Sequence, residues 1–139
     1  MAFHPYLFFS GTCREAFTRY QEIFGGELVL LPMSDMPGEE GDAPPEQTEL
    51  IMHAALTFEG DLLMASDDPT GDGGPVKGMS VNYATVDPGQ AERVFNALAE
   101  GGAVTMPLAE MFWSPKFGMC VDRFGIPWMV STDQPAATA

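Results

Sequence analysis

The feature that most constrains this chain is an internal duplication centred on two pairs of glycines. Gly25-Gly26 separates a helix-like segment from a run of Leu and Val residues, and Gly101-Gly102 separates two similar segments in the second half. Before each pair, apolar residues recur at the spacing of one helix face, and glycine supplies the left-handed backbone that ends a helix. We therefore predict that the chain of 139 residues consists of one structural unit used twice.

Each predicted helix has a start signal. Thr12 and Glu15 have the spacing of a capping box, in which the threonine oxygen and the glutamate satisfy free backbone amides of the first turn. In the second half, Asp87 is an N-cap candidate and Pro88 suits the first helical position. The apolar stripes that follow are Ala16, Phe17, Tyr20, Ile23 and Phe24 in the first helix, and Ala91, Val94, Phe95, Leu98 and Ala99 in the second.

Strand-like segments flank both helices in the same order. One precedes each helix, one follows each glycine pair, and each half closes with a hairpin signal around Glu59-Gly60 or Phe124-Gly125. We predict an α+β chain of two tandem βαβββ modules within a single domain over 1–139. The modules span about 4–67 and 79–133, with a linker at 68–78, a tail at 134–139, and insertions at 34–49 and 109–116.

The two modules are expected to depend on each other. A module of about 65 residues buries little of its surface and is marginally stable alone. A helix covers only one face of its sheet, so we expect the other faces to form a curved mixed sheet around a central cleft. Aligning Gly60 with Gly125 matches Met64 with Met129 and His53 with Gly118.

Charge and composition exclude several classes of partner. Six basic and 20 acidic side chains give a formal charge of −14, which opposes binding to nucleic acid or to an anionic membrane. No apolar run approaches the roughly 18 residues needed to span a bilayer, and the start MAFHPYLFF lacks the basic region of a signal peptide. With only two cysteines, we expect reduced thiols and a cytoplasmic protein.

His53 is the candidate functional side chain in the body of the chain. In the segment LIMHAALTF, Met52, Ala54, Leu56 and Phe58 form an apolar face suited to the helix, which leaves His53 pointing into the cleft. Two interpretations stay open. The imidazole is either a structural group bonded to a neighbouring strand or to Glu110, or a general base or anchor for a polar ligand group.

Other candidates line the same predicted cleft. Trp113 lies in the insertion at 109–116 and suits either a pocket wall or a plug in the core or dimer seam. Alternation with Gly118 places Cys120 on the cleft face, whereas Cys13 begins a helix, where backbone amides lower the pKa of a thiol. The candidate ligand-binding residues are His53, Met64, Trp113, Phe117, Cys120 and Met129, and the candidate catalytic residues are His53 and Glu110.

Three segments carry a family resemblance: YLFFSGTCREAFTRYQEIFGGEL, IMHAALTFEGDLLMASDD and EMFWSPKFGMCVDRFGIPWMV. Together with the paired βαβββ pattern, they resemble the PhnB-like branch of the vicinal oxygen chelate superfamily, which includes glyoxalase I, extradiol dioxygenases and bleomycin resistance proteins. The branch is often labelled as demethylubiquinone methyltransferase-like. The sequence lacks the glycine-rich turn and parallel doubly wound pattern that would seat a nucleoside cofactor.

The resemblance implies a divalent metal that this sequence does not support. Superfamily enzymes usually bind it through His, Gln or Glu from the first strand of each module and a Glu near the end of the fourth. The corresponding strands, 5–9 and 80–85, contain none of these residues, and the usual glutamate position falls at Met129, with Met64 as its mate. Thioethers are soft, weak ligands for hard divalent ions, so we expect this metal site to be lost.

The resulting expectation is a PhnB-like protein, forming a homodimer, that binds a small organic molecule in an apolar cleft without a cofactor. Two alternatives stay open. One is a metal-dependent lyase, isomerase or dioxygenase of the same superfamily. The other is a metal-independent enzyme that uses His53.

Overall fold

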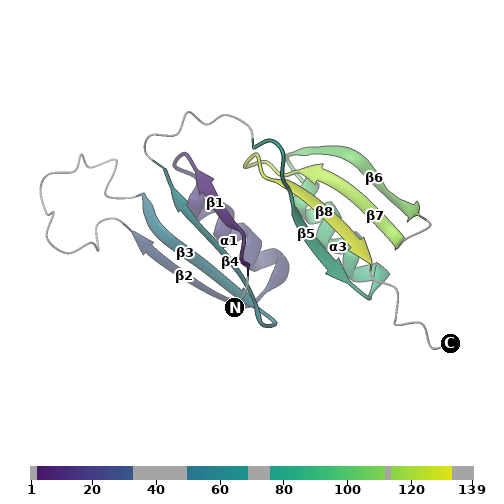
Figure 1. Ribbon diagram of the computed structural model, residues 1–139, viewed down its shortest axis with the longest axis horizontal. Helices are drawn as coiled ribbons and strands as arrows, with labels where there is room; N and C mark the ends of the chain where they lie inside the picture. Colours follow the sequence, from purple (N-terminus) through teal and green to yellow (C-terminus); the bar gives the residue numbers. More distant parts are fainter. Residues whose placement is uncertain (1–2, 33–49, 69–75, 112–113, 133–139) are drawn as a thin grey trace, which may run out of the picture. The chain divides into compact units, whose positions relative to one another are not determined.

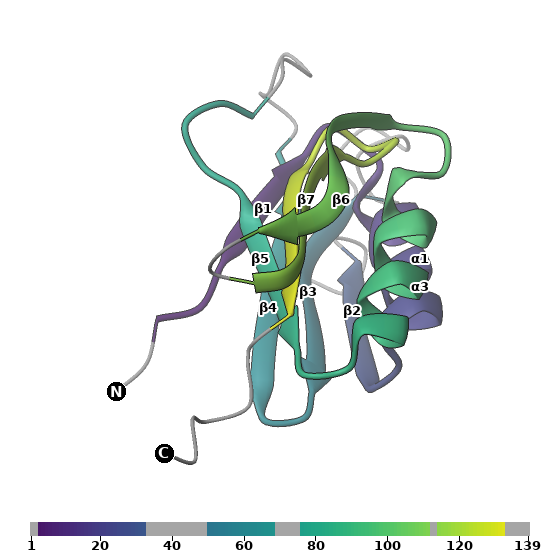
Figure 2. The ribbon, with the colours of Figure 1, turned by 90° about the vertical axis from the view of Figure 1, so that its right-hand side faces the viewer.

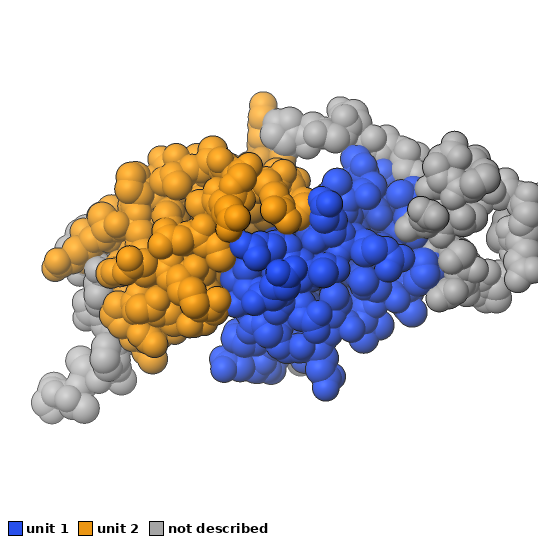
Figure 3. Space-filling view, turned by 180° about the vertical axis from the view of Figure 1, so that it is seen from behind, with its two compact units in different colours: residues 1–74 blue, residues 75–139 orange. Residues whose placement is uncertain are grey.

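A computed structural model describes residues 3–32, 50–68, 76–111 and 114–132 of the chain. The chain divides into two compact units, unit 1 (Met1–Gly74) and unit 2 (Pro75–Ala139), which Figure 3 shows in different colours. No helix in the described part is long and apolar enough to cross a lipid bilayer.

Unit 1 contains a four-stranded mixed sheet with one helix along one face (Figure 1). Its elements are β1 (Tyr6–Phe9), α1 (Cys13–Phe24), β2 (Glu27–Pro32), β3 (Ile51–Phe58) and β4 (Asp61–Asp67). The strand order is β1-β4-β3-β2; β1 runs parallel to β4 and the other pairs are antiparallel.

Unit 2 repeats this arrangement. Its elements are β5 (Val81–Thr85), α3 (Pro88–Ala99), β6 (Ala103–Met111), β7 (Ser114–Val121) and β8 (Pro127–Thr132). The order is β5-β8-β7-β6, again with one parallel pair, β5 and β8. The predicted α+β architecture of two βαβββ modules is confirmed. The described strands pair as two separate four-stranded sheets, with no ladder joining them.

Each core lies between a helix and the sheet of its own unit, as Figure 2 shows for α1 and α3. The predicted apolar stripes are buried, apart from the half-buried Phe24 and Ala99. Within unit 1 the stripe packs on sheet residues that include Leu7, Phe9 and Leu56. The stripe of unit 2 packs on buried residues of β7 and β8, including Trp128 and Val130.

The second glycine of each pair explains why the pairs recur. A Cβ atom on Gly26 would lie 2.2 Å from the carbonyl oxygen of Thr57, and one on Gly102 would lie 2.0 Å from that of Val121. Both oxygens belong to the third strand of the unit. The backbone that leaves each helix therefore passes so close to this strand that no side chain fits between them.

The start of α1 differs from the sequence prediction. Thr12 makes no side-chain capping bond, so the predicted capping box is wrong. The carboxylate of Asp67, at the end of β4, accepts hydrogen bonds from the backbone N–H groups of Gly11 (2.9 Å) and Cys13 (3.0 Å), and also from that of Ile51 (2.9 Å). In α3 the predicted cap is confirmed, since Asp87 accepts from the N–H of Gly89 at 2.9 Å.

Candidate functional site

Each sheet has a face opposite the helix of its own unit, here called the distal face. In β1, Leu7 and Phe9 are buried toward α1, so alternation places Tyr6 and Phe8 on the distal face. The register of the neighbouring strands extends this face across the sheet. The distal face of unit 1 comprises Tyr6, Phe8, Glu27, Val29, Leu31, His53, Ala55, Thr57, Leu62, Met64 and Ser66.

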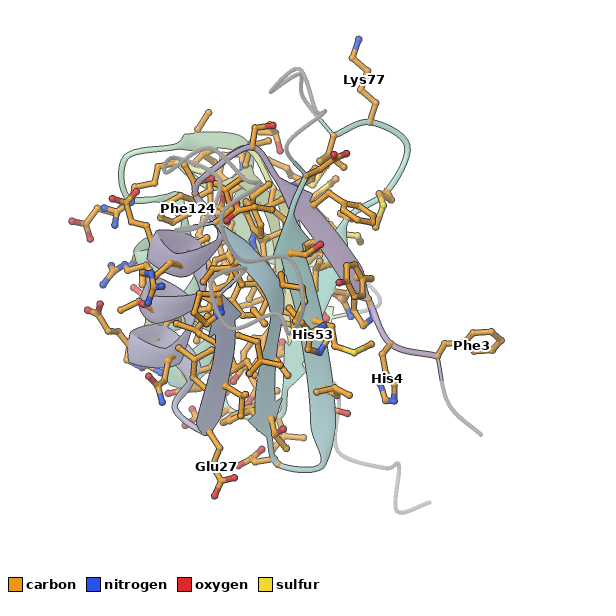
Figure 4. The ribbon with its side chains drawn as sticks, turned by 90° about the vertical axis from the view of Figure 1, so that its left-hand side faces the viewer. Phe3, His4, Glu27, His53, Lys77 and Phe124 are labelled. Carbon is orange, nitrogen blue, oxygen red and sulfur yellow. The ribbon has the colours of Figure 1, made fainter. Side chains whose placement is uncertain are left out.

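Three rings stand together on this face. The centroids of Tyr6 and Phe8 are 5.2 Å apart, and those of Tyr6 and His53 are 6.0 Å apart. Figure 4 shows His53 on the side of the sheet away from α1. Although they belong to regular strands, Tyr6 is 37% and Phe8 62% exposed. We call these three residues the aromatic group.

Apolar side chains extend the aromatic group toward the edge strand β2. Val29 is 53% and Leu31 39% exposed, and Met64 lies directly opposite Tyr6 in the β1–β4 pair. Among the paired distal positions of β1 to β4, the one carboxylate is that of Glu27. The surface is therefore mainly apolar and aromatic, and an imidazole and a phenol stand within the aromatic group as hydrogen-bonding groups.

The distal face of unit 2 is built from different residues at equivalent positions. Its first and fourth strands contribute Asn82, Ala84, Met129 and Ser131, and β7 contributes Phe117 and Met119. The hydroxyl of Ser131 donates to the side-chain oxygen of Asn82 at 3.4 Å. Phe117 is 8% exposed, and the described residues of this face include no exposed aromatic ring like those of Tyr6 and Phe8 in unit 1.

The strand register corrects the predicted match between His53 and Gly118. Ala55 pairs with Met64 and Met119 pairs with Met129, so Ala55 and Met119 are equivalent, and Phe117 is the equivalent of His53. The reason is hairpin length. Only Glu59 and Gly60 separate the paired residues in the first hairpin, whereas residues 122–126 separate them in the second.

The different hairpin lengths shift the alignment of β3 and β7 by one residue, and this shift also reverses the predicted orientation of Cys120. The residue is 1% exposed and pairs with the buried Trp128, and a Cβ on Gly118, two residues earlier, would lie 2.8 Å from the Phe95 ring of α3. Cys120 therefore faces the helix and not the distal face. Burial raises the pKa of its thiol to about 11, and the negative charge of Asp122 adds to the increase.

The prediction that helix amides lower the pKa of Cys13 is also wrong. Burial, together with a smaller contribution from the carboxylate of Asp67, raises the pKa of this thiol to about 12, while Arg14 acts in the opposite direction. Both cysteines are free, buried and protonated at neutral pH. Neither is a nucleophile under those conditions, because the thiolate is the reactive form.

The raised thiol pKa values predict a loss of stability at alkaline pH. An ordinary thiol ionises near the usual value of 9.0, whereas the folded chain keeps Cys13 and Cys120 protonated to about 12 and 11. The stabilising contribution is thus fully present below pH 9.0 and is lost as pH rises through the folded values. Urea unfolding followed over this range should show a shallower decline for the Cys13→Ala, Cys120→Ala double variant; equal slopes would contradict the expectation.

The remaining candidates divide between the units. His53 and Met64 share the distal face of unit 1, while Phe117 and Met129 share that of unit 2. Glu110 is an exposed residue of β6, and the predicted Trp113 lies outside the described residues. Tyr6 and Phe8 were not among the residues predicted for the site, although the alternation in YLFF contained the signal: Leu7 and Phe9 turn toward the helix.

The resemblance implies metal ligands on the first and fourth strands of each unit, and the distal positions of these strands hold no carboxylate and no imidazole. The distal positions of the first and fourth strands hold Tyr6, Phe8, Met64 and Ser66 in unit 1, and Asn82, Ala84, Met129 and Ser131 in unit 2. Carboxylates suit hard divalent ions and imidazoles suit divalent transition metals, and these positions offer neither. Among the residues with described positions, no three His, Cys, Asp or Glu side chains are grouped as a metal site would require.

Comparison with known proteins identifies the family. The model described as 3-demethylubiquinone-9 3-methyltransferase matches residues 1–131. The chain belongs to this family. Protein YjdN of Escherichia coli (strain K12) is 30% identical to it over 139 residues, which cover 94% of this chain and 95% of YjdN. The expected resemblance to PhnB-like proteins is confirmed.

Solved structures agree with this assignment. Protein PA1353 from Pseudomonas aeruginosa is 44% identical, with a TM-score of 0.86 over 97% of this chain and 99% of its own. A putative 3-demethylubiquinone-9 3-methyltransferase, PhnB protein, from Bacillus cereus is 27% identical, with a TM-score of 0.77 over 95% and 99%. A glyoxylase/bleomycin resistance protein/dioxygenase domain from Frankia sp. EAN1pec, 15% identical over 96% and 98%, shares the fold with a TM-score of 0.65.

Proposed function

We propose that this PhnB-like chain binds a small, predominantly apolar organic molecule on the distal face of unit 1. The observation that carries the proposal is the exposed aromatic group, in which Tyr6, Phe8 and His53 have neighbouring rings. Exposed apolar area costs about 25 cal/mol per Å², so covering two rings with a ligand is favourable.

We further propose that binding does not require the divalent metal of the superfamily. The support is chemical: a tyrosine, a phenylalanine, thioethers, hydroxyls and an amide occupy the positions where that metal would need carboxylates or imidazoles. His53, a residue of β3, has its ring beside that of Tyr6 in β1. Its proposed role is to donate a hydrogen bond to the polar end of the ligand or to accept one from it. The same imidazole would be the base if the protein catalyses a reaction.

Ligand-observed NMR with indole as a neutral aromatic probe tests the proposal. Phe8→Ala should weaken indole binding about fivefold, because one stacking ring is worth about 1 kcal/mol. Phe8 is 62% exposed, so the substitution should leave the fold intact. Val86→Ala, at a 67% exposed apolar residue of unit 2, is the matched control and should leave binding unchanged.

Two results would contradict the proposal. Equal indole affinity in the Phe8→Ala and wild-type proteins would remove the aromatic group as the binding surface. Metal analysis of protein purified without chelator separately checks the metal-free binding mode. If the protein contains one equivalent of a divalent ion, and chelation removes both the ion and indole binding, then binding depends on the metal.

We also propose that the chain forms a homodimer through the edge strand β6. Val104 and Met106 of this strand are 50% and 36% exposed, and an edge strand presents unpaired backbone groups to a second chain. Light scattering should then report twice the mass of one chain.

A further inference from the structure

We propose that the ligand of the aromatic group is an organic cation, such as a quaternary or protonated amine attached to an apolar body. This inference rests on the proposed function and assigns the charge of the ligand. It is carried by the position of the aromatic group within the charge distribution of unit 1.

Unit 1 carries most of the negative charge of the protein. Residues 1–74 contain 14 acidic and two basic side chains, so this unit accounts for −12 of the formal −14. Its two basic residues, Arg14 and Arg19, both belong to α1, which lies on the opposite side of the sheet from the aromatic group. Among the described residues, the distal face of unit 1 therefore has no Lys or Arg side chain, and the carboxylate of Glu27, on the edge strand opposite β1, adds negative potential.

The four remaining basic residues belong to unit 2 and lie in its described part: Lys77, Arg93, Lys116 and Arg123. Lys116 forms an ion pair with Glu92 at 2.9 Å, and the Arg123 guanidinium carbon lies 4.9 Å from the centroid of the Phe124 ring. Arg93 donates to Gln90 on the same helix at 3.1 Å. These three side chains already have partners within their own unit.

The N–H groups at the start of α1 provide no binding site for an anion on the distal face of unit 1. A helix N-terminus can bind phosphate through its free N–H groups, but α1 begins on the helix side of the sheet. Its N–H groups at Gly11 and Cys13 already donate to the carboxylate of Asp67, at 2.9 and 3.0 Å. A phosphate, phosphonate or carboxylate ligand would thus meet neither a guanidinium nor a free helix amide from the described part of unit 1.

The rings themselves favour a cation. The face of an aromatic ring attracts a positive charge within about 6 Å of its centroid, by about 0.5 to 2 kcal/mol. Tyr6 and Phe8 have centroids 5.2 Å apart and planes inclined at 45°, so one ammonium group can lie within this range of both. The negative potential of unit 1 acts in the same direction over longer distances.

Three probes of similar size separate the possibilities in the full-length protein. Phenyltrimethylammonium is the cation, tert-butylbenzene its neutral isostere, and phenylphosphonate the anion. At low salt we expect the affinity for the cation to be at least about fivefold higher than that for the isostere. We expect no detectable binding of the anion. The preference for the cation should decrease as salt screens the charge of unit 1.

A conservative variant locates the effect. Phe8→Leu keeps an apolar side chain but removes the π system, so it should lower cation affinity about fivefold more than it lowers tert-butylbenzene affinity. The Val86→Ala control should change neither.

The possible outcomes are distinguishable. Phe8-dependent binding of tert-butylbenzene as tight as that of the cation would overturn the inference and leave the proposed function standing. Tighter binding of phenylphosphonate would also overturn it. If none of the three probes binds in a manner that depends on Phe8, the inference and the proposed function both fail.

Discussion

Gly26→Ala is expected to destabilise the chain by about 4 kcal/mol, the sum of an overpacking cost and a left-handed backbone cost. A Cβ at this position would lie 2.2 Å from the carbonyl oxygen of Thr57, a distance at which the backbone must move. The residue also has φ +89°, which a side chain disfavours. The change in the free energy of unfolding can be measured by urea denaturation with circular dichroism.

Two variants separate the causes. Gly25→Ala has φ +80° and no atom within 4 Å of the new Cβ, so it should cost only about 1 kcal/mol. Gly102→Ala would place its Cβ 2.0 Å from the Val121 oxygen without a positive φ, and should cost about 2 to 3 kcal/mol. A Gly26→Ala protein as stable as the Gly25→Ala protein would show that the close approach to β3 does not exist.

Asp67→Ala is the second substitution with a large expected effect, about 4 kcal/mol. The side chain is 4% exposed, and its two oxygens accept from the N–H groups of Gly11, Cys13 and Ile51. Removing it leaves three backbone donors without an acceptor, and each buried unsatisfied donor costs about 1 to 3 kcal/mol. The bonds join the start of α1 to β3 and β4, so thermal unfolding should begin at a markedly lower temperature.

Asp61→Ala provides the matched control within the same strand. Asp61 is exposed, so its removal should change stability by less than about 0.5 kcal/mol. Asp67→Asn should fall between the two, because it retains one acceptor oxygen but turns an NH₂ group toward a backbone donor. Equal stability of the Asp67→Ala and Asp61→Ala proteins would mean that the carboxylate does not hold the three segments together.

The distal faces show how a duplicated fold can keep its architecture and change its surface. Unit 1 has the exposed rings of Tyr6 and Phe8 where unit 2 has Asn82 and Ala84. His53 is replaced by Phe117 at the equivalent position of β7. Both helix-facing cores conserve the same pattern of buried apolar residues. The proposed ligand-binding properties therefore belong to one unit and are not a property of the fold.

The sequence by itself determined the parts of this protein that depend on local physics. Apolar residues at helical spacing predicted α1 and α3, and the glycine pairs predicted where both helices end. The order of strands and helices then predicted two βαβββ modules, because each element carries its own periodicity and its own turn residues. The orientation of His53 also followed from the alternation within β3.

Tertiary structure decided the features that depend on pairing between distant segments. Side chains along a strand alternate between the two faces of a sheet. A shift of one residue in the alignment of two hairpins therefore moves each side chain of the strand to the opposite face. The longer loop at residues 122–126 therefore turned Cys120 toward the helix. The acceptor at the start of α1 is likewise Asp67, 54 positions beyond Cys13 along the chain, and no local pattern around Thr12 reveals it.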